Sequence, residues 1–497
     1  MKSNTTRLLV RNVFHLGIGQ VASTILGVLL TAVLGRALGA ADFGVLYSVL
    51  AITAFVAVAI DWGQTQYLVR EVARGRPDEP ELIGSALAIR LATTVVGCAV
   101  AVAIASALGY SEHIVLLTLL AMIAGLPVIL YAPLSFKFRG KDRMDIDAFA
   151  NIAGKALTLI ACAIALHFGG GLTDVILMQG VGGISTLLVG AFFALRLGFE
   201  VKAPSTKVVR EIMEHGVPIT AFSLVIASQP FVEIMMLSAF AGPAVVGWYG
   251  ASRTIFGIIS SPATIMLTAF FPELSRASRS LPDLRRMIDA TARVLFIAAA
   301  LASSALYLFA DHVVAIIYGK GHFEQTASIL RASAVFIPLL FFVLLLATAM
   351  TAVGRNKAMV GISIVRIVFC VVLGWFLIGY GQQHYGNGAI FLVIIAGVAE
   401  IPAMIACLVL LPRGAVGKTT TLNLVRACVT AICTVLPLAL VGPLQLWYLI
   451  PLFALMFALA AMATRLVLPS DLQHALDIAR EGVSGLRRPK PQLTPGA

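Results

Sequence analysis

Residues 114–168 read IVLLTLLAMIAGLPVILYAPLSFKFRGKDRMDIDAFANIAGKALTLIACAIALHF, in which two apolar runs flank a short basic loop. Each run, 114–134 and 146–168, is about as long as the 20 residues that a helix needs to cross a bilayer. The basic residues of the loop are Lys137, Arg139, Lys141 and Arg143. Because loops that stay in the cytoplasm are enriched in Lys and Arg, this segment predicts two spanning helices joined on the cytoplasmic side.

Apolar runs of the same kind recur along most of the chain. Hydrophobic residues make up 59% of the 497 residues, and the mean hydropathy is +0.96, which excludes an ordinary water-soluble protein. We therefore predict an all-α polytopic membrane protein with about fourteen transmembrane helices. The predicted spans are 11–34, 45–68, 82–108, 114–134, 146–168, 173–195, 216–240, 244–271, 290–310, 328–353, 359–379, 388–411, 423–442 and 446–467.

The 36 Lys and Arg residues are divided unevenly between two alternating sets of connectors. Most of them lie in one set, whereas the other set holds only Arg36 and Lys320. The positive-inside rule places the basic set, and both termini, in the cytoplasm. The net charge of +12 is thus spread along a membrane surface and does not indicate nucleic-acid binding.

A weak internal repeat relates the first half of the chain to the second. Gly39–Gly44 resembles Gly242–Gly247 at a separation of about 203 residues, and Gly140–Met144 resembles Gly354–Met359 at about 214. Since six spans separate the copies, the two halves have the same orientation in the membrane. The predicted parts are an N-lobe with helices 1–6 (1–200), a C-lobe with helices 7–12 (201–412), helices 13–14 (413–468) and a cytoplasmic tail (469–497).

Three short strings carry a family resemblance: LGRALGAADFG at 34–44, VREVAR at 69–74 and GWYGASR at 247–253. With them the chain resembles the polysaccharide and O-antigen repeat-unit flippases of the multidrug/oligosaccharidyl-lipid/polysaccharide (MOP) exporter superfamily. The resemblance implies a MATE-like fold of two six-helix lobes around a central lumen, followed by two C-terminal helices. It also implies movement of undecaprenyl-pyrophosphate-linked oligosaccharide from the inner to the outer leaflet for surface polysaccharide biosynthesis.

The same resemblance implies a bacterial cytoplasmic (inner) membrane location and a transporter that is not an enzyme. The partners that it implies are the lipid-linked oligosaccharide, membrane lipids, and polysaccharide polymerase and chain-length proteins. The surface glycans that such flippases serve include lipopolysaccharide and exopolysaccharide.

Charged residues inside the predicted spans are the candidate functional residues, because a charge near the bilayer centre costs at least about 2.5–3.5 kcal/mol. Asp61 and Arg90, and likewise Glu233 and Arg253, lie at similar depths on neighbouring spans and are predicted to pair. Unpaired cations are the better ligands for a pyrophosphate headgroup, so Lys155 and Arg366 are preferred. The predicted substrate-binding residues are Lys155, Arg366, Arg253 and Arg90.

Three acidic residues in the spans, Glu400, Glu233 and Asp61, are candidates for ion coupling. Glu400 lies near the predicted midplane, where desolvation favours a protonated carboxyl, so it could carry H+ or respond to Na+. Pairing of Glu400 with Arg366 or Lys155 would explain its presence equally well. No cofactor or metal is expected, since the cysteines fall in apolar runs without metal-ligand spacing.

Three alternatives to this function stay open. A drug/cation antiporter of the same superfamily would favour an acidic, aromatic-lined cavity, whereas the charges in these spans lean basic. A membrane oligosaccharide polymerase would need a large outer loop, and the outer connectors here are short. A lipid-linked peptidoglycan precursor flippase would have the same fold and differ only in the glycan that it moves.

Overall fold

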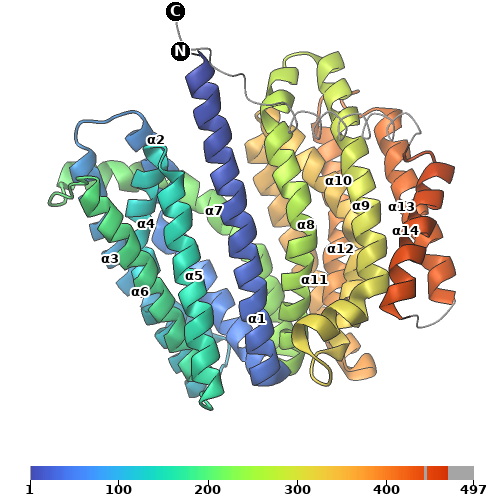
Figure 1. Ribbon diagram of the computed structural model, residues 1–497, viewed down its shortest axis with the longest axis horizontal. Coiled ribbons are helices and arrows are strands. Elements are labelled where there is room, and N and C mark those ends of the chain that lie inside the picture. The colour runs from blue at the N-terminus through green and yellow to red at the C-terminus, as the bar shows by residue number, and fades with distance from the viewer. Residues whose placement is uncertain (1, 441–444, 468–497) are drawn as a thin grey trace, which may run out of the picture. The chain divides into compact units, whose positions relative to one another are not determined.

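The computed structural model describes residues 2–440 and 445–467, with the side chains of the first helix described at Gly19 and from Val21 onward. The predicted cytoplasmic tail, 469–497, lies outside the described residues. The described ranges form fourteen helices and contain no strand (Figure 1). They are α1 (Lys2–Asp61), α2 (Gln64–Ala73), α3 (Glu79–Ala107), α4 (Glu112–Gly140), α5 (Met144–His167), α6 (Leu172–Arg196), α7 (Thr206–Phe240), α8 (Pro243–Ala277), α9 (Leu281–Tyr318), α10 (Glu324–Ala352), α11 (Asn356–Tyr385), α12 (Gly388–Leu410), α13 (Lys418–Leu440) and α14 (Leu446–Ala463).

Thirteen of the described helices are long and apolar enough to cross a membrane, and the exception is the short α2. The first two predicted spans form one long helix, α1. Its backbone breaks between them at Gly39, where φ is 74° and ψ is 177°. A stretch as long as its apolar part, Val21–Asp61, would measure about 60 Å if it were straight, twice the thickness of the hydrocarbon core. The prediction of an all-α, polytopic membrane protein with about fourteen spans is therefore confirmed.

The predicted end of the second span is wrong. We expected helix to residue 68, but α1 ends at Asp61, since Trp62 and Gly63 both have a left-handed backbone with φ of 48° and 67°. After this break α2 begins as an amphipathic helix. It buries Tyr67, Leu68 and Val72 and leaves the basic Arg70 and Arg74 exposed. Such a helix is suited to the interface between membrane and water.

The chain divides into two compact units. Unit 1 combines the described residues up to Ser261 with Ala310–Ser333 and Arg355–Ala403. Unit 2 combines Pro262–Phe309, Ala334–Gly354 and the described residues from Met404 onward. The lobe boundaries predicted from the sequence stay a prediction.

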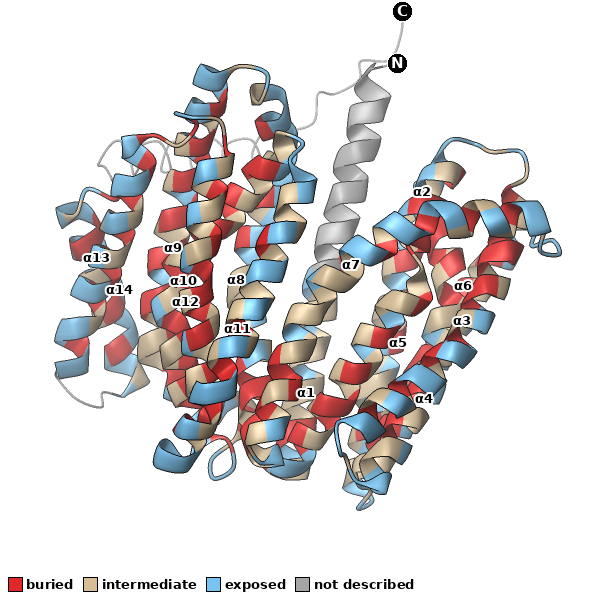
Figure 2. Ribbon diagram, turned by 180° about the vertical axis from the view of Figure 1, so that it is seen from behind, coloured by how far each residue is buried: buried red, intermediate tan, exposed pale blue. Residues whose placement is uncertain are grey.

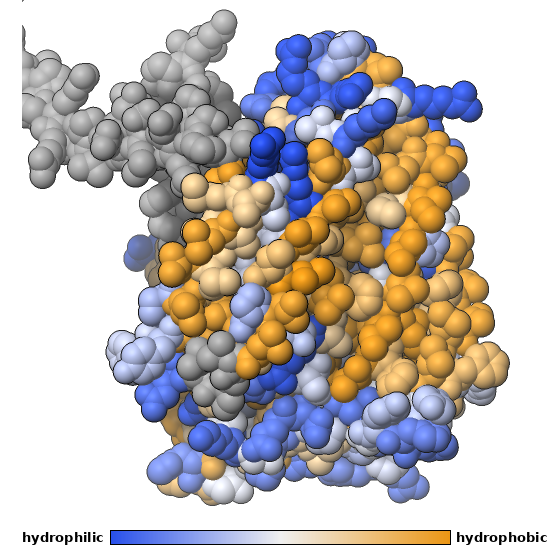
Figure 3. Space-filling view, turned by 90° about the vertical axis from the view of Figure 1, so that its right-hand side faces the viewer, coloured by the Kyte–Doolittle hydropathy of each residue, from blue (hydrophilic) through white to orange (hydrophobic). Residues whose placement is uncertain are grey.

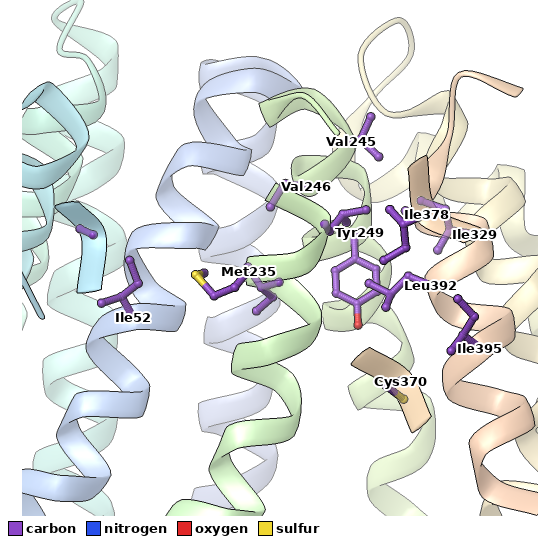
Figure 4. Packing of buried hydrophobic residues seen from close by; sticks show 14 of the residues in the cluster. Ile52, Met235, Val245, Val246, Tyr249, Ile329, Cys370, Ile378, Leu392 and Ile395 are labelled. Carbon is purple, nitrogen blue, oxygen red and sulfur yellow. The ribbon is translucent and has the colours of Figure 1, made fainter. Parts of the chain in front are cut away.

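The core of unit 1 brings together helices that are far apart in the chain (Figure 4). Within this unit, α1 also packs along α5, and α4 packs between α3 and α6. Buried members of the core include Ile52 of α1, Met235 of α7, Val246 and Tyr249 of α8, Cys370 of α11 and Leu392 and Ile395 of α12. Unit 2 has its own aromatic contacts, with ring centroids 5.6 Å apart for Phe296–Phe342 and 5.4 Å for Phe309–Phe453.

Large apolar side chains cover much of the outer surface of the helices, as expected for a protein solvated by lipid tails. Val95 is 73% exposed and Phe376 is 70% exposed. Figure 2 shows exposed and buried residues alternating around single helices. On the face seen in Figure 3, a broad apolar band lies between hydrophilic ends. This distribution is the one that a membrane-spanning bundle requires.

Candidate functional site

Arg90 of α3 is engaged by residues at the end of α1 and the start of α2. Its Nη2 donates to Asp61 Oδ1, and its Nε donates to Gln64 Oε1 at 3.1 Å. The guanidinium also lies over the Phe136 ring, 5.3 Å from its centroid, and the residue is only 4% exposed. The predicted Asp61–Arg90 pair is confirmed, so this guanidinium already has a carboxylate partner.

Arg366 of α11 has two partners from different helices. Its Nη1 donates to Glu400 Oε1 of α12 at 2.8 Å, and its Nη2 donates to Gln229 Oε1 of α7. The prediction that Arg366 is unpaired is wrong, and the alternative in which Glu400 pairs with Arg366 is confirmed. Hydropathy places a residue along its helix axis but does not say which neighbouring helix it faces.

Glu233 of α7 does not take the partner that we predicted. Its carboxylate accepts from the Tyr249 hydroxyl at 2.7 Å and from Gln229 Nε2 at 3.0 Å. Arg253 lies one turn beyond Tyr249 on α8, and no described carboxylate lies within ion-pair distance of its guanidinium. The predicted Glu233–Arg253 pair is therefore wrong, because a neutral hydroxyl and an amide satisfy the buried carboxylate instead.

Gln229 joins these contacts into one network inside unit 1. Its amide nitrogen donates to Glu233 and its amide oxygen accepts from Arg366, which in turn holds Glu400. The network contains two carboxylates and one guanidinium, so it carries one excess negative charge when both acids are ionised. One carboxylate oxygen, Glu400 Oε2, is buried and has no hydrogen-bond partner among the described residues.

Sequence reasoning missed Gln64 and Tyr249 as members of these networks. Gln229 lies four residues before Glu233, so both residues share one face of α7, and this spacing was an available signal. Gln64 and Tyr249 reach their partners across helices, and no spacing in the sequence reveals such contacts.

Lys155 of α5 is an exposed cation on a spanning helix, as predicted. Its Nζ donates to the Ser23 hydroxyl of α1 and lies 3.5 Å from the Ser23 carbonyl oxygen. No carboxylate in the described ranges lies within ion-pair distance of it. Lys155 and Arg253 thus share one property: each is a charged side chain on a spanning helix without an acidic partner in the part of the chain that the structure describes.

Comparison with known proteins gives a family and a fold. Residues 9–278 match the model of a family described as polysaccharide biosynthesis protein. A search of curated proteins found no match. The structure is similar to a lipid II flippase MurJ in an inward closed conformation, with a TM-score of 0.73 and 12% identity over 90% of this chain and 98% of that one.

Two transporters of the MOP superfamily are also similar. An inward-facing multidrug resistance MATE family transporter gives a TM-score of 0.64 and 16% identity over 79% of this chain and 96% of that one. A MOP superfamily transporter from Pyrococcus furiosus gives a TM-score of 0.54 and 17% identity over 80% of this chain and 94% of that one. The fold is therefore the MATE-like fold that the sequence predicts.

Proposed function

The chain belongs to the polysaccharide biosynthesis protein family, and from that premise we propose that it is a flippase for undecaprenyl-pyrophosphate-linked oligosaccharide. In this proposal the headgroup moves from the inner to the outer leaflet and supplies surface polysaccharide biosynthesis. The fold, which is also that of a lipid II flippase and of MOP transporters, supports a transport role rather than an enzymatic one.

The observation that carries the proposal is that Lys155 and Arg253 have no acidic partner among the residues that the structure describes. A charge on a spanning helix is costly unless an opposite charge compensates it. A pyrophosphate diester is dianionic and would provide that compensation while it is bound. Lysine would act as a point charge, and the guanidinium of arginine would hold two phosphate oxygens at once.

The two other predicted substrate-binding residues have smaller roles in this proposal. Arg90 and Arg366 each hold a carboxylate, so phosphate would have to displace Asp61 or Glu400 to reach them. We therefore assign the first contact with the pyrophosphate to Lys155 and Arg253. Glu233 is a spanning carboxylate whose described partners are neutral, but Lys155 and Arg253 are two cations without a described acidic partner, so the drug/cation antiporter is less well supported.

The test combines a gene deletion with a measurement of lipid-linked oligosaccharide in each leaflet of the membrane. The deleted strain receives the wild-type chain, Lys155→Ala, Arg253→Ala or the control Lys357→Ala, an exposed lysine in the first turn of α11. Lipid-linked oligosaccharide is then quantified in sealed inside-out and right-side-out vesicles. We expect the first two variants to trap the lipid in the inner leaflet at normal protein level, while the control exports normally. Full export by both variants would refute the proposal.

For ion coupling we propose the network of Glu400, Arg366, Gln229 and Glu233, with Asp61 as the weaker candidate. The unpartnered oxygen of Glu400 is a point where H+ or Na+ could bind without displacing Arg366. Glu400→Gln should then abolish the response of export to an imposed pH or sodium gradient. An unchanged gradient response in this variant would exclude Glu400 as the coupling residue.

We also propose a location in the bacterial cytoplasmic membrane, with both termini in the cytoplasm and with polymerase and chain-length proteins as partners. The concentration of Lys and Arg in one set of connectors supports this orientation, and exposed aromatic residues mark the membrane interfaces. Trp375 and Phe376 lie in the later half of α11, and Trp447 and Tyr448 lie at the start of α14, all near predicted outer ends. Labelling of single cysteines placed in the loops of intact cells tests the orientation.

A further inference from the structure

A polar cavity of about 440 Å³ lies inside unit 1, among helix ends and connectors that the sequence places on the cytoplasmic side. Its walls come from the start of α3, the end of α4, and the connectors before α3, before α5 and after α6. None of the residues assigned above to pyrophosphate or to ion coupling lines it. The charged lining residues are Arg76, Glu79, Lys137, Lys141, Arg143 and Glu200.

Lys137 is the unusual member of this group, because its side chain is only 3% exposed. Its Nζ lies 3.0 Å from Glu79 Oε1 and 4.3 Å from the centroid of the Phe199 ring. The same carboxylate also serves Lys141, whose Nζ lies 3.0 Å from Glu79 Oε2. Two ammonium groups thus share one carboxylate, which leaves one positive charge without compensation in the cavity wall.

The remaining arginines of the lining are balanced by other acids. Arg76 lies 2.6 Å from Asp78 Oδ1 and 2.6 Å from Glu211 Oε1. Arg143 lies 3.1 Å from Asp145 Oδ1. The positive charge that lacks a carboxylate of its own is therefore local to the two lysines, because Arg76 has two acidic partners and Arg143 has one.

Glu200 is an exposed residue of the lining, and its carboxylate lies beyond ion-pair distance of every described Lys and Arg side chain. Only its backbone oxygen approaches Lys137 Nζ, at 3.4 Å. Lys141 is 43% exposed, so its ammonium is available to a ligand.

We propose that this cavity binds the phosphate group of an anionic headgroup. Basic pockets between transmembrane helices on the cytoplasmic side fit the headgroups of anionic lipids. A phosphate oxygen would accept a charge-assisted hydrogen bond from Lys141 and would balance the excess charge that Lys137 and Lys141 share. The ring of Phe199 provides an apolar wall for the carbon atoms next to the phosphate. The proposal is independent of the exported substrate, and it extends the function to recognition of the inner leaflet.

The test measures ligand binding to the purified full-length protein in a neutral detergent. Phosphatidylglycerol, phosphatidylcholine, inorganic phosphate and inorganic pyrophosphate are titrated separately, and bound ligand is read by native mass spectrometry and by the shift in melting temperature. We expect saturable binding of phosphatidylglycerol and weaker binding of phosphatidylcholine. Lys141→Gln should weaken binding about fivefold, the effect of one basic residue at a membrane surface.

Two further variants keep the outcome clear. Glu79→Gln removes the carboxylate that the two lysines share and so increases the local positive charge, and it should bind phosphatidylglycerol more tightly than the wild type. Lys207→Gln removes an exposed lysine at the start of α7, outside the cavity, and is the matched control. Equal affinity in Lys141→Gln and Lys207→Gln would overturn the proposal, as would weaker phosphatidylglycerol binding by a folded Glu79→Gln variant.

Competition identifies the source of the phosphate. If millimolar inorganic phosphate or pyrophosphate displaces phosphatidylglycerol from the wild type, the cavity serves a soluble oxyanion. If neither competes while Lys141→Gln still weakens lipid binding, it serves a lipid headgroup. Binding of none of the four ligands would refute the site.

Discussion

Gly44 of α1 and Gly247 of α8 pack backbone against backbone in unit 1. A Cβ atom on Gly44 would overlap the Pro243 carbonyl oxygen and lie 2.7 Å from the Gly247 nitrogen. A Cβ atom on Gly247 would overlap the Ala40 carbonyl oxygen and lie 3.2 Å from the Gly44 nitrogen. The offset of about 203 residues relates Gly44 to Gly247 and also Ala40 to Pro243. The two copies of the repeated motif therefore meet symmetrically at these positions.

Because the atoms that crowd these positions belong to the backbone, they cannot rotate away from a new side chain. We expect Gly44→Val or Gly247→Val to lower the free energy of unfolding by about 1–3 kcal/mol, the usual cost of overpacking. The double variant should cost less than the sum, since both changes break one contact. Thermal unfolding in detergent measures this, with Gly257→Ala as control, because nothing lies within 4 Å of a Cβ there. Strictly additive losses would contradict a shared contact.

Arg366 and Lys155 should respond differently to removal of their charge. Arg366→Ala leaves Glu400 buried without its cation, which should cost about 3 kcal/mol of stability and lower the protein level. Lys155→Ala removes an exposed cation that has no carboxylate partner among the described residues, so stability should change little while export is lost.

A double variant separates the two effects. Arg366→Met/Glu400→Leu removes both charges of the buried pair and should recover most of the stability that Arg366→Ala loses. Export should not recover with it if the network couples transport to an ion. Recovery of stability and export together would assign the pair a structural role only.

Acid should weaken the pairing of Arg76 with Asp78 inside the α2–α3 connector. Hydrogen bonds from Arg76 hold the pKa of Asp78 below its ordinary value. A carboxyl with a lowered pKa in the folded state contributes stability above its unfolded pKa of about 3.9, and this contribution is lost as the pH falls through the folded pKa. The melting temperatures of wild type and Arg76→Gln should therefore differ most near neutral pH and converge in acid. A difference that stays constant with pH would contradict the role of Asp78.

The sequence predicted the features that depend on position along one helix. Hydropathy located the spans, and the family match over residues 9–278 confirms the predicted family. The wrong predictions of pairing concern the direction in which a side chain points around its helix axis. We predicted the Glu233–Arg253 pair only from the similar depth of the two residues in the membrane. The side chain that contacts Glu233 from α8 is instead Tyr249, one turn before Arg253.

Backbone conformation was also beyond the reach of hydropathy. The left-handed φ at Trp62 ends α1 at the mostly polar stretch Asp61–Gln66, which the predicted span included. Partner choice and such breaks depend on packing between helices, which a single sequence does not record.

Tyr249 should control whether Arg253 stays unpaired. Its hydroxyl donates to Glu233, and removal of a donor from a buried carboxylate costs about 1–3 kcal/mol. In Tyr249→Phe the Glu233 carboxylate would lack that donor. Arg253, one turn beyond residue 249 on α8, is then the cation of that helix which can pair with it. A Glu233–Arg253 pair would then compete with phosphate, so we expect export to fall several-fold at similar protein level. Tyr249→Phe/Glu233→Gln removes the competing charge and should export better than Tyr249→Phe alone. If the double variant exports no better, Tyr249 acts through packing and not by keeping Arg253 available.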